Sequence, residues 1–144
     1  MKASSAVVDT NVLISARLIA NSAPARVVAQ LREQGAKLLF SEATLAELDA
    51  RLRLPKFRRY VSLDEVEAFL KTLADIVELR EPDIAVTVCR DRDDNKFLSL
   101  AQDGQADCII TGDRDLLVLN PFEGIPILSP SAFLGMTRGQ PDKP

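Results

Sequence analysis

The sequence predicts an α/β protein, a three-layer α/β/α sandwich around a central, mostly parallel sheet. Short apolar runs alternate along the chain with segments whose apolar residues recur at helical spacing. Strands that alternate with helices form βαβ units, and right-handed crossovers then cover both faces of a parallel sheet. The length of 144 residues is that of one domain. We expect this domain over residues 1–134, followed by a disordered, Gly- and Pro-rich tail over 135–144.

In the first half of the chain, turn and capping residues separate the predicted elements. Ser22 and Pro24 suit a helix start, and Gly35 suits a helix end. Ser41 can cap the next helix, and Pro55 stops it. The expected elements are a strand over 6–8, a helix after Asp9, a helix over about 25–34, a strand over 36–40, a helix over about 42–54 and a short helical turn with Phe57 and Tyr60.

The second half follows the same plan. Ser62 and Glu65 fit a capping box, and Gly104 suits a helix end. Residues 75–79 alternate polar and apolar side chains, which is typical of an edge strand, whereas 80–92 show no readable pattern. The expected elements are a helix after Ser62, the strand over 75–79, a helix from 93 to 104, a strand over 108–111, a helix opened by 112–115, a strand over 125–128 and a closing turn over 130–134.

Composition excludes several classes of function. The chain has no histidine, which excludes Ser-His-Asp and Cys-His catalysis and any zinc site with histidine ligands. Cys89 and Cys108 form no metal-binding spacing and no disulfide framework, so we expect two small, partly buried thiols in a cytoplasmic protein. No apolar run approaches the roughly 18 residues of a membrane span, and the first residues do not resemble a signal peptide. The net charge of −3 gives no overall argument for nucleic-acid binding, so such an argument must be local.

Four aspartates are placed to meet at one edge of the predicted sheet. Asp9 follows the first strand, Asp113 and Asp115 follow a later strand, and Asp94 begins a helix. In a parallel α/β sheet these strand-to-helix loops lie at the carboxyl edge, where ligands bind. The alternative is ordinary helix capping, because aspartate oxygens accept hydrogen bonds from the free N–H groups of a first helical turn.

Asp94 is the aspartate for which capping alone is the weakest explanation. Phe97, Leu98 and Ala101 lie three, four and seven residues after it, so all four side chains share one helix face. The carboxylate should therefore point at the sheet edge, and the neighbouring Asp93 could cap the helix instead.

Convergence of these acids would require a cation. Two carboxylates about 5 Å apart repel by roughly 3 kcal/mol at an effective dielectric near 20. Oxygen ligands without histidine or cysteine suit Mg²⁺ or Mn²⁺. Either ion can activate water and stabilise both oxygens of a phosphodiester displacement.

Four segments together resemble the successive motifs of PIN-domain ribonucleases, and within them the branch of toxins from bacterial toxin–antitoxin systems. They are 8–12 (VDTNV), 47–48 (EL), 93–98 (DDNKFL) and 111–117 (TGDRDLL). The resemblance implies a PIN-like fold and a divalent-metal-dependent endoribonuclease that hydrolyses RNA with a metal-activated water. It also implies a cognate antitoxin protein as a partner and a homodimer.

The resemblance also assigns roles to residues. It implies that Asp9, Glu47, Asp94 and Asp113 are the catalytic, metal-binding acids, with Asp115 as an additional metal ligand. The supporting residues would be Thr10, Asn11, Asp93 and Thr111. The helical pattern itself places Glu47 roughly 130° from the apolar face of its helix, so a solvent-facing glutamate is the alternative. The family resemblance also implies a further acid five residues after the third aspartate. Ser99 stands there in this chain, which favours a weak or absent second metal site.

Basic residues gather near the predicted acids and could bind RNA phosphates. The candidates are Arg51, Arg53, Lys56, Arg58, Arg59, Lys96 and Arg114. The alternative is a solvated helix end whose basic residues complement the helix dipole. Phe57 and Tyr60 could stack on bases, but a role in the core or a dimer is the stronger expectation.

The leading hypothesis is therefore a metal-dependent endoribonuclease. The alternative from another class is a non-catalytic PIN-like module that binds RNA or an antitoxin. A receiver-like domain with Asp9 as phosphoacceptor is weaker, because Val7 and Val8 stand where an acidic pair is usual.

Overall fold

The computed structural model describes residues 1–139. Its strands are β1 (Ser5–Val8), β2 (Lys37–Phe40), β3 (Val77–Leu79), β4 (Cys108–Ile110) and β5 (Ile127–Leu128). Its helices are α1 (Thr10–Leu18), α2 (Ala23–Glu33), α3 (Glu42–Leu52), α4 (Leu63–Ala74), α5 (Asn95–Gly104), α6 (Arg114–Leu117) and α7 (Pro130–Gly139), with 3₁₀ turns η1 (Pro55–Phe57) and η2 (Arg92–Asp94).

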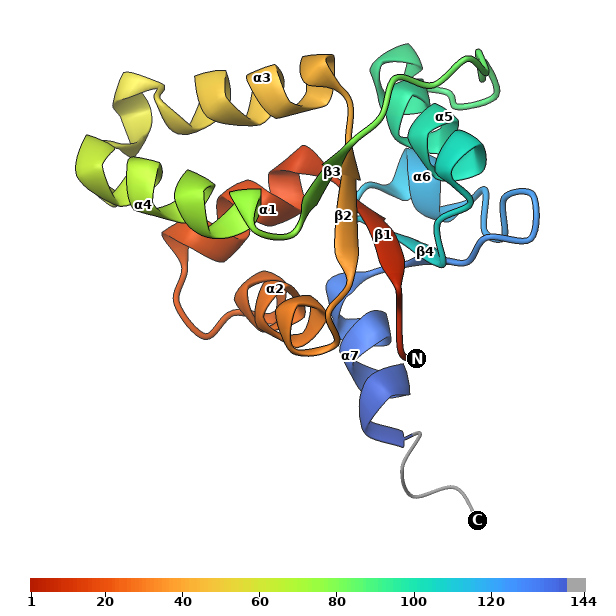
Figure 1. Cartoon of the computed structure of the whole chain (residues 1–144), viewed down its shortest axis with the longest axis horizontal. Helices are drawn as coiled ribbons and strands as arrows, with labels where there is room; N and C mark the ends of the chain where they lie inside the picture. The colour runs from red at the N-terminus through yellow and green to blue at the C-terminus, as the bar shows by residue number, and fades with distance from the viewer. Residues whose placement is uncertain (140–144) are drawn as a thin grey trace.

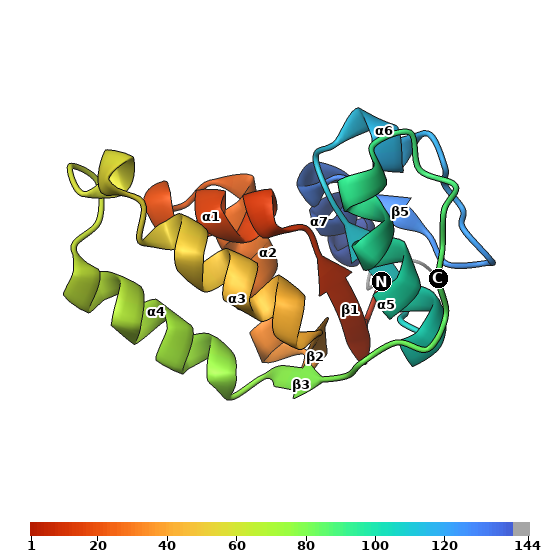
Figure 2. The ribbon, with the colours of Figure 1, turned by 90° about the horizontal axis from the view of Figure 1, so that it is seen from above.

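The five strands form one parallel sheet in the order β3-β2-β1-β4-β5. Alternate strand residues face opposite helical layers. Val8 belongs to a buried cluster that includes residues of α1, α2, α3, α4 and α7, whereas Val7 belongs to a second cluster with residues of α5 and α6. Figures 1 and 2 show α5 and α6 on one side of the sheet and the larger group of helices on the other. The predicted α/β sandwich and its parallel sheet are confirmed.

Capping residues set the helix boundaries, as the sequence predicts. The hydroxyl of Ser22 accepts a hydrogen bond from the backbone of α2, and Ser41 and Ser62 each form a capping box at α3 and α4. Gly35 follows α2 with a φ of 71°, a conformation that glycine adopts without strain. The alternating segment around Glu78 is β3, an edge strand of the sheet.

The predicted closing turn over 130–134 is wrong, because these residues begin helix α7. The hydroxyl of Ser129 accepts a hydrogen bond from the N–H of Ala132, and Phe133 is fully buried among residues of the larger helical layer. This burial outweighs the modest helix penalty of Gly135. The expected disordered tail therefore overlaps a helix up to residue 139, and 140–144 lie outside the described residues.

The central strands β1 and β4 bring the candidate site together. They lie side by side with Val8 opposite Ile110, so the residues that follow them meet at the same carboxyl edge. The backbone N–H of Asp9 donates to the carbonyl of Ile110 at 2.9 Å and continues this pairing beyond β1. Within residues 1–139 no single helix is long and apolar enough to cross a membrane; α1 and α2 pass that test only jointly, with a bend of 103° between them.

Core packing behind the site gives a stability prediction. Leu98 of α5 is fully buried against the sheet, whereas Val118, just after α6, is 74% exposed. We expect Leu98→Ala to lower the free energy of unfolding by about 2–5 kcal/mol, because it removes buried methyl groups and leaves a cavity. The matched change Val118→Ala should cost no more than about 0.5 kcal/mol. Urea unfolding measures both, and equal losses would contradict the burial of Leu98.

Candidate metal centre

Asp9 lies at the end of β1 and is 4% exposed. Its Oδ2 accepts a hydrogen bond from the Thr111 hydroxyl at 2.7 Å, and its Oδ1 accepts one from the Asn11 N–H at 3.0 Å. Burial raises the pKa of Asp9, the two hydrogen bonds oppose that rise, and the charge of Asp113 adds to it. Asp9 therefore caps α1 and also belongs to an acidic site, so the two interpretations of this residue are compatible.

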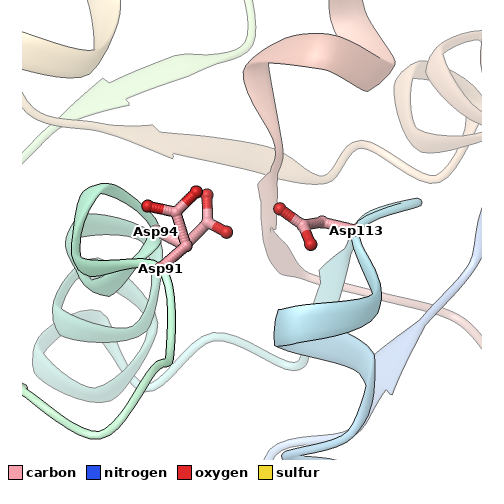
Figure 3. Close-up of side chains that lie close together, drawn as sticks. All are labelled: Asp91, Asp94 and Asp113. Carbon is pink, nitrogen blue, oxygen red and sulfur yellow. The ribbon is translucent and has the colours of Figure 1, made fainter.

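Three further aspartates meet beside it. Ligand oxygens of Asp91, Asp94 and Asp113 all lie within 4.8 Å of one another. Figure 3 shows the carboxylates of Asp91 and Asp94 on one side and that of Asp113 opposite them. Asp91 comes just before η2, Asp94 ends η2, and Asp113 precedes α6. Such a group of carboxylate oxygens suits a hard divalent cation.

Asp94 supplies the strongest sign that a cation belongs there. It is 7% exposed, and its Oδ2 is buried without a hydrogen-bond partner among the described residues. It makes no capping hydrogen bond to α5. Burial raises the pKa of Asp94 to about 8, and the neighbouring Asp113 carboxylate adds to that rise. Because a bound divalent ion would satisfy the unpaired oxygen and offset the repulsion, the residues present fit such an ion.

Asp91 is the member of this group that sequence reasoning missed. It ends the segment 80–92, which has no readable period, and α5 holds that segment in place. The N–H of Val86 donates to the Ser99 hydroxyl at 3.2 Å, and the N–H of Cys89 donates to Asn95 Oδ1 at 2.9 Å. Asp91 itself caps η2 by accepting from the Asp93 N–H at 3.0 Å. The cluster of three aspartates within 91–94 was the signal that could have identified it.

Glu47 lies next to the aspartates but is not a member of their group. Its Oε1 accepts a hydrogen bond from the Thr10 hydroxyl at 2.8 Å, and its Oε2 accepts one from Lys96 Nζ at 2.7 Å. Its side chain is only 25% exposed, so it does not face open solvent. Glu47 therefore lies beside Thr10, the residue that follows Asp9. Both carboxylate oxygens of Glu47 already accept hydrogen bonds.

The other predicted residues connect these acids. Thr111 donates to Asp9 and accepts from the Asp113 N–H at 2.9 Å, so one hydroxyl positions two carboxylates. Asp93 pairs with Lys96 at 3.0 Å and does not cap α5, contrary to one interpretation of the sequence. Asp115 donates its N–H to Asp113 Oδ1 at 2.9 Å, and its carboxylate lies outside the group of three.

Only part of the predicted basic cluster faces the site. Arg51 donates to Asn11 Oδ1 at 2.6 Å, and its charge lowers the pKa of Asp9. Lys96 contacts Glu47, and Arg114 is an exposed residue at the start of α6. The remaining candidates contact their own neighbourhood: Arg53 pairs with Asp49 and Glu67, Arg58 donates to the Leu52 carbonyl, and Lys56 and Arg59 lie over the rings of Phe57 and Tyr60 at 5.1 and 5.8 Å.

Comparison with known families agrees with this geometry. The model of the PIN domain matches residues 5–115, which span the acidic site. The chain belongs to the PIN-domain family. PIN domains are generally metal-dependent nucleases, and they commonly bind RNA.

The chain is also similar to two archaeal proteins. The chain is 34% identical over 114 residues to the uncharacterized protein MJ1680 of Methanocaldococcus jannaschii, covering 78% of this chain and 73% of MJ1680. The crystal structure of PAE2754 from Pyrobaculum aerophilum is similar with a TM-score of 0.62 and 17% sequence identity, covering 94% of this chain and 90% of that one. At that identity the second match supports the fold alone.

The raised pKa of Asp94 predicts how stability changes with pH in metal-free protein. Between the ordinary value of 3.8 and about 8, the folded protein holds a proton on Asp94 that the unfolded chain has lost. The contribution of Asp94 to the free energy of unfolding is therefore complete below its unfolded-state pKa of 3.8. It is lost as the pH rises toward the folded-state pKa of about 8.

We expect Asp94→Asn to remove this dependence. With EDTA present, the free energy of unfolding of the variant minus that of the wild type should increase from pH 5 to pH 8. Urea unfolding at several pH values measures this difference. A difference that stays constant over the range would show that Asp94 does not titrate as described.

Proposed function

We propose that this chain is a divalent-metal-dependent endoribonuclease that uses Mg²⁺ or Mn²⁺, with Asp9, Glu47, Asp94 and Asp113 as the acids of its active site. Asp91 joins them in this proposal. Membership of the PIN-domain family supports a nuclease. The observation that carries the proposal is the meeting of Asp91, Asp94 and Asp113 around a buried, unpaired oxygen of Asp94.

The reaction is hydrolysis of an RNA phosphodiester. The oxygen of a water attacks phosphorus, the bond to the leaving oxygen breaks, and that oxygen takes up a proton. A bound divalent ion would lower the pKa of the attacking water and stabilise the charge of both oxygens. The chain's own residues supply position: Thr111 holds Asp9 and the backbone of Asp113, and Asn11 holds Arg51 beside them.

RNA would approach over the cations of this edge. Arg51 and Lys96 lie among the acids, and Arg114 is exposed beside Asp113. Their charges favour phosphate near an otherwise acidic surface. Of the remaining basic residues after Glu47, the exposed Lys56 and Arg59 would extend this contact along the RNA, whereas Arg53 and Arg58 already have partners within the chain.

We further propose that the chain is a toxin of a toxin–antitoxin system, controlled by a cognate antitoxin and active as a homodimer in the cytoplasm. This finer assignment rests on the resemblance of the four sequence motifs alone. We also propose that the chain folds as a single domain, in which α7 extends beyond the boundary at 134 expected from the sequence.

A second candidate function is a PIN-like module that binds RNA or an antitoxin without turnover. The observation that favours it is Glu47, whose two oxygens are already bound by Thr10 and Lys96. RNA binding without metal-dependent cleavage would distinguish this module from the nuclease.

Cleavage assays test the proposed nuclease. We expect the protein to cut single-stranded or structured RNA with Mn²⁺ or Mg²⁺ and to stop when EDTA is added. Asp9→Asn, Asp94→Asn and Asp113→Asn should each lower the rate by about 100-fold or more, because each removes a carboxylate that would hold the divalent ion at the reacting phosphate.

The matched control is Asp64→Asn, an exposed aspartate in the first turn of α4, which should leave the rate unchanged. Circular dichroism should show that all four variants fold. If Asp94→Asn cleaves RNA at the wild-type rate, the proposed active site is wrong. If the wild type binds RNA without cleaving it, the second candidate function is favoured.

A further inference from the structure

Lys96 is already paired with acids at the edge of the site. Its Nζ lies 2.7 Å from Glu47 Oε2 and 3.0 Å from Asp93 Oδ2. The side chains of Lys96 and Glu47 are each 25% exposed, so the pair is partly shielded from water. A lysine ammonium has three protons, and in the described part of the chain the third has no hydrogen-bond partner, although Nζ lies 5.3 Å from the centroid of the Phe97 ring.

The acids therefore form two sets, one without a cationic partner and one already paired with Lys96. Asp91, Asp94 and Asp113 converge on an unpaired oxygen and have no ion-pair partner in residues 1–139. Glu47 and Asp93, in contrast, already have a cation, and the second oxygen of Glu47 is held by Thr10. A metal ion on Glu47 would have to displace the ammonium or lie beside it, and two neighbouring cations repel.

Ser99 supports the same division. Ser99, five residues after Asp94, is not an acid, and its buried hydroxyl accepts from the Val86 N–H at 3.2 Å. Ser99 thus holds the segment that precedes Asp91, and it adds no negative charge to the site. The negative charge of these two sets of acids suits one divalent ion and the Lys96 ammonium.

We propose that Lys96 takes the place of a second divalent ion, so that the chain binds a single ion through its aspartates while Lys96 presents its free proton to a phosphate oxygen of RNA. This inference rests on the proposed nuclease function. Lys96 acts here as a fixed positive charge and hydrogen-bond donor, with no covalent step. Its pairing with Glu47 holds the ammonium at the carboxyl edge of the sheet, two residues after Asp94.

Metal stoichiometry tests this role without relying on activity. Isothermal titration with Mn²⁺ should show one ion per chain for the wild type and for Lys96→Arg, which keeps the charge. Lys96→Met should bind two, because loss of the ammonium frees Glu47. The double variant Lys96→Met with Glu47→Gln should return to one ion, since the freed carboxylate is gone.

The matched control is Lys37→Met, an exposed lysine at the start of β2, on the opposite edge of the sheet from the site. It should bind one ion like the wild type. RNA cleavage at saturating Mn²⁺ supplies a second readout: Lys96→Arg should retain more activity than Lys96→Met, and Lys37→Met should match the wild type.

The outcomes separate this inference from the proposed function. Two ions on the wild type, or a single ion on a folded Lys96→Met, would overturn the role of Lys96 and leave the nuclease proposal intact. No bound Mn²⁺ on the wild type would overturn both. One bound ion on the wild type, two on Lys96→Met and one on the double variant would support the inference.

Discussion

Repulsion between carboxylates at the carboxyl edge of β1 and β4 is the constraint on which the site depends. Asp9 and Asp113 lie close together because they follow the neighbouring parallel strands β1 and β4. Asp94, at the end of η2, faces Asp113. Burial raises the pKa values of Asp9 and Asp94, and the nearby Asp113 carboxylate adds to both rises. A small domain is stable by only about 5–15 kcal/mol, so such a cluster persists only when other groups offset it.

The structure offsets the charge unevenly. Asp9 accepts two hydrogen bonds and lies near Arg51, and Glu47 has Thr10 and Lys96. Asp94 has no such compensation, because one of its oxygens is buried without a partner in the described residues. The negative charge that no other group offsets is therefore localised among the aspartates next to η2 and α6. This localisation is the basis for our proposals of a divalent ion among these aspartates and of Lys96 as the cation at Glu47.

Much of this arrangement follows from sequence pattern. The period of the apolar residues predicts the sheet and the main helices, and Asp9 and Asp94 stand out because each lies where a strand or an apolar helix face meets a loop. Capping boxes at Ser41 and Ser62 are local and are readable from a few residues.

Other features depend on contacts between distant segments and cannot be predicted in this way. Asp91 reaches the site only because Ser99 and Asn95 hold the irregular segment before it. The pair between Glu47 and Lys96 joins residues 49 positions apart. Helix α7 forms although Gly135 weakens it, because Phe133 is buried against the larger helical layer, a tertiary effect that outweighs local propensity.

Thermal unfolding of metal-free protein, with and without millimolar Mn²⁺, tests the central claim that the aspartates form a cation site. An ion in about a hundredfold excess over its Kd stabilises the folded state by about 2.7 kcal/mol, which corresponds to a rise in Tm of roughly 5–10 °C for a chain of this size. The account predicts such a rise for the wild type and for Asp64→Asn, and a much smaller one for Asp94→Asn. An absent rise in the wild type, or an equal rise in Asp94→Asn, would contradict it.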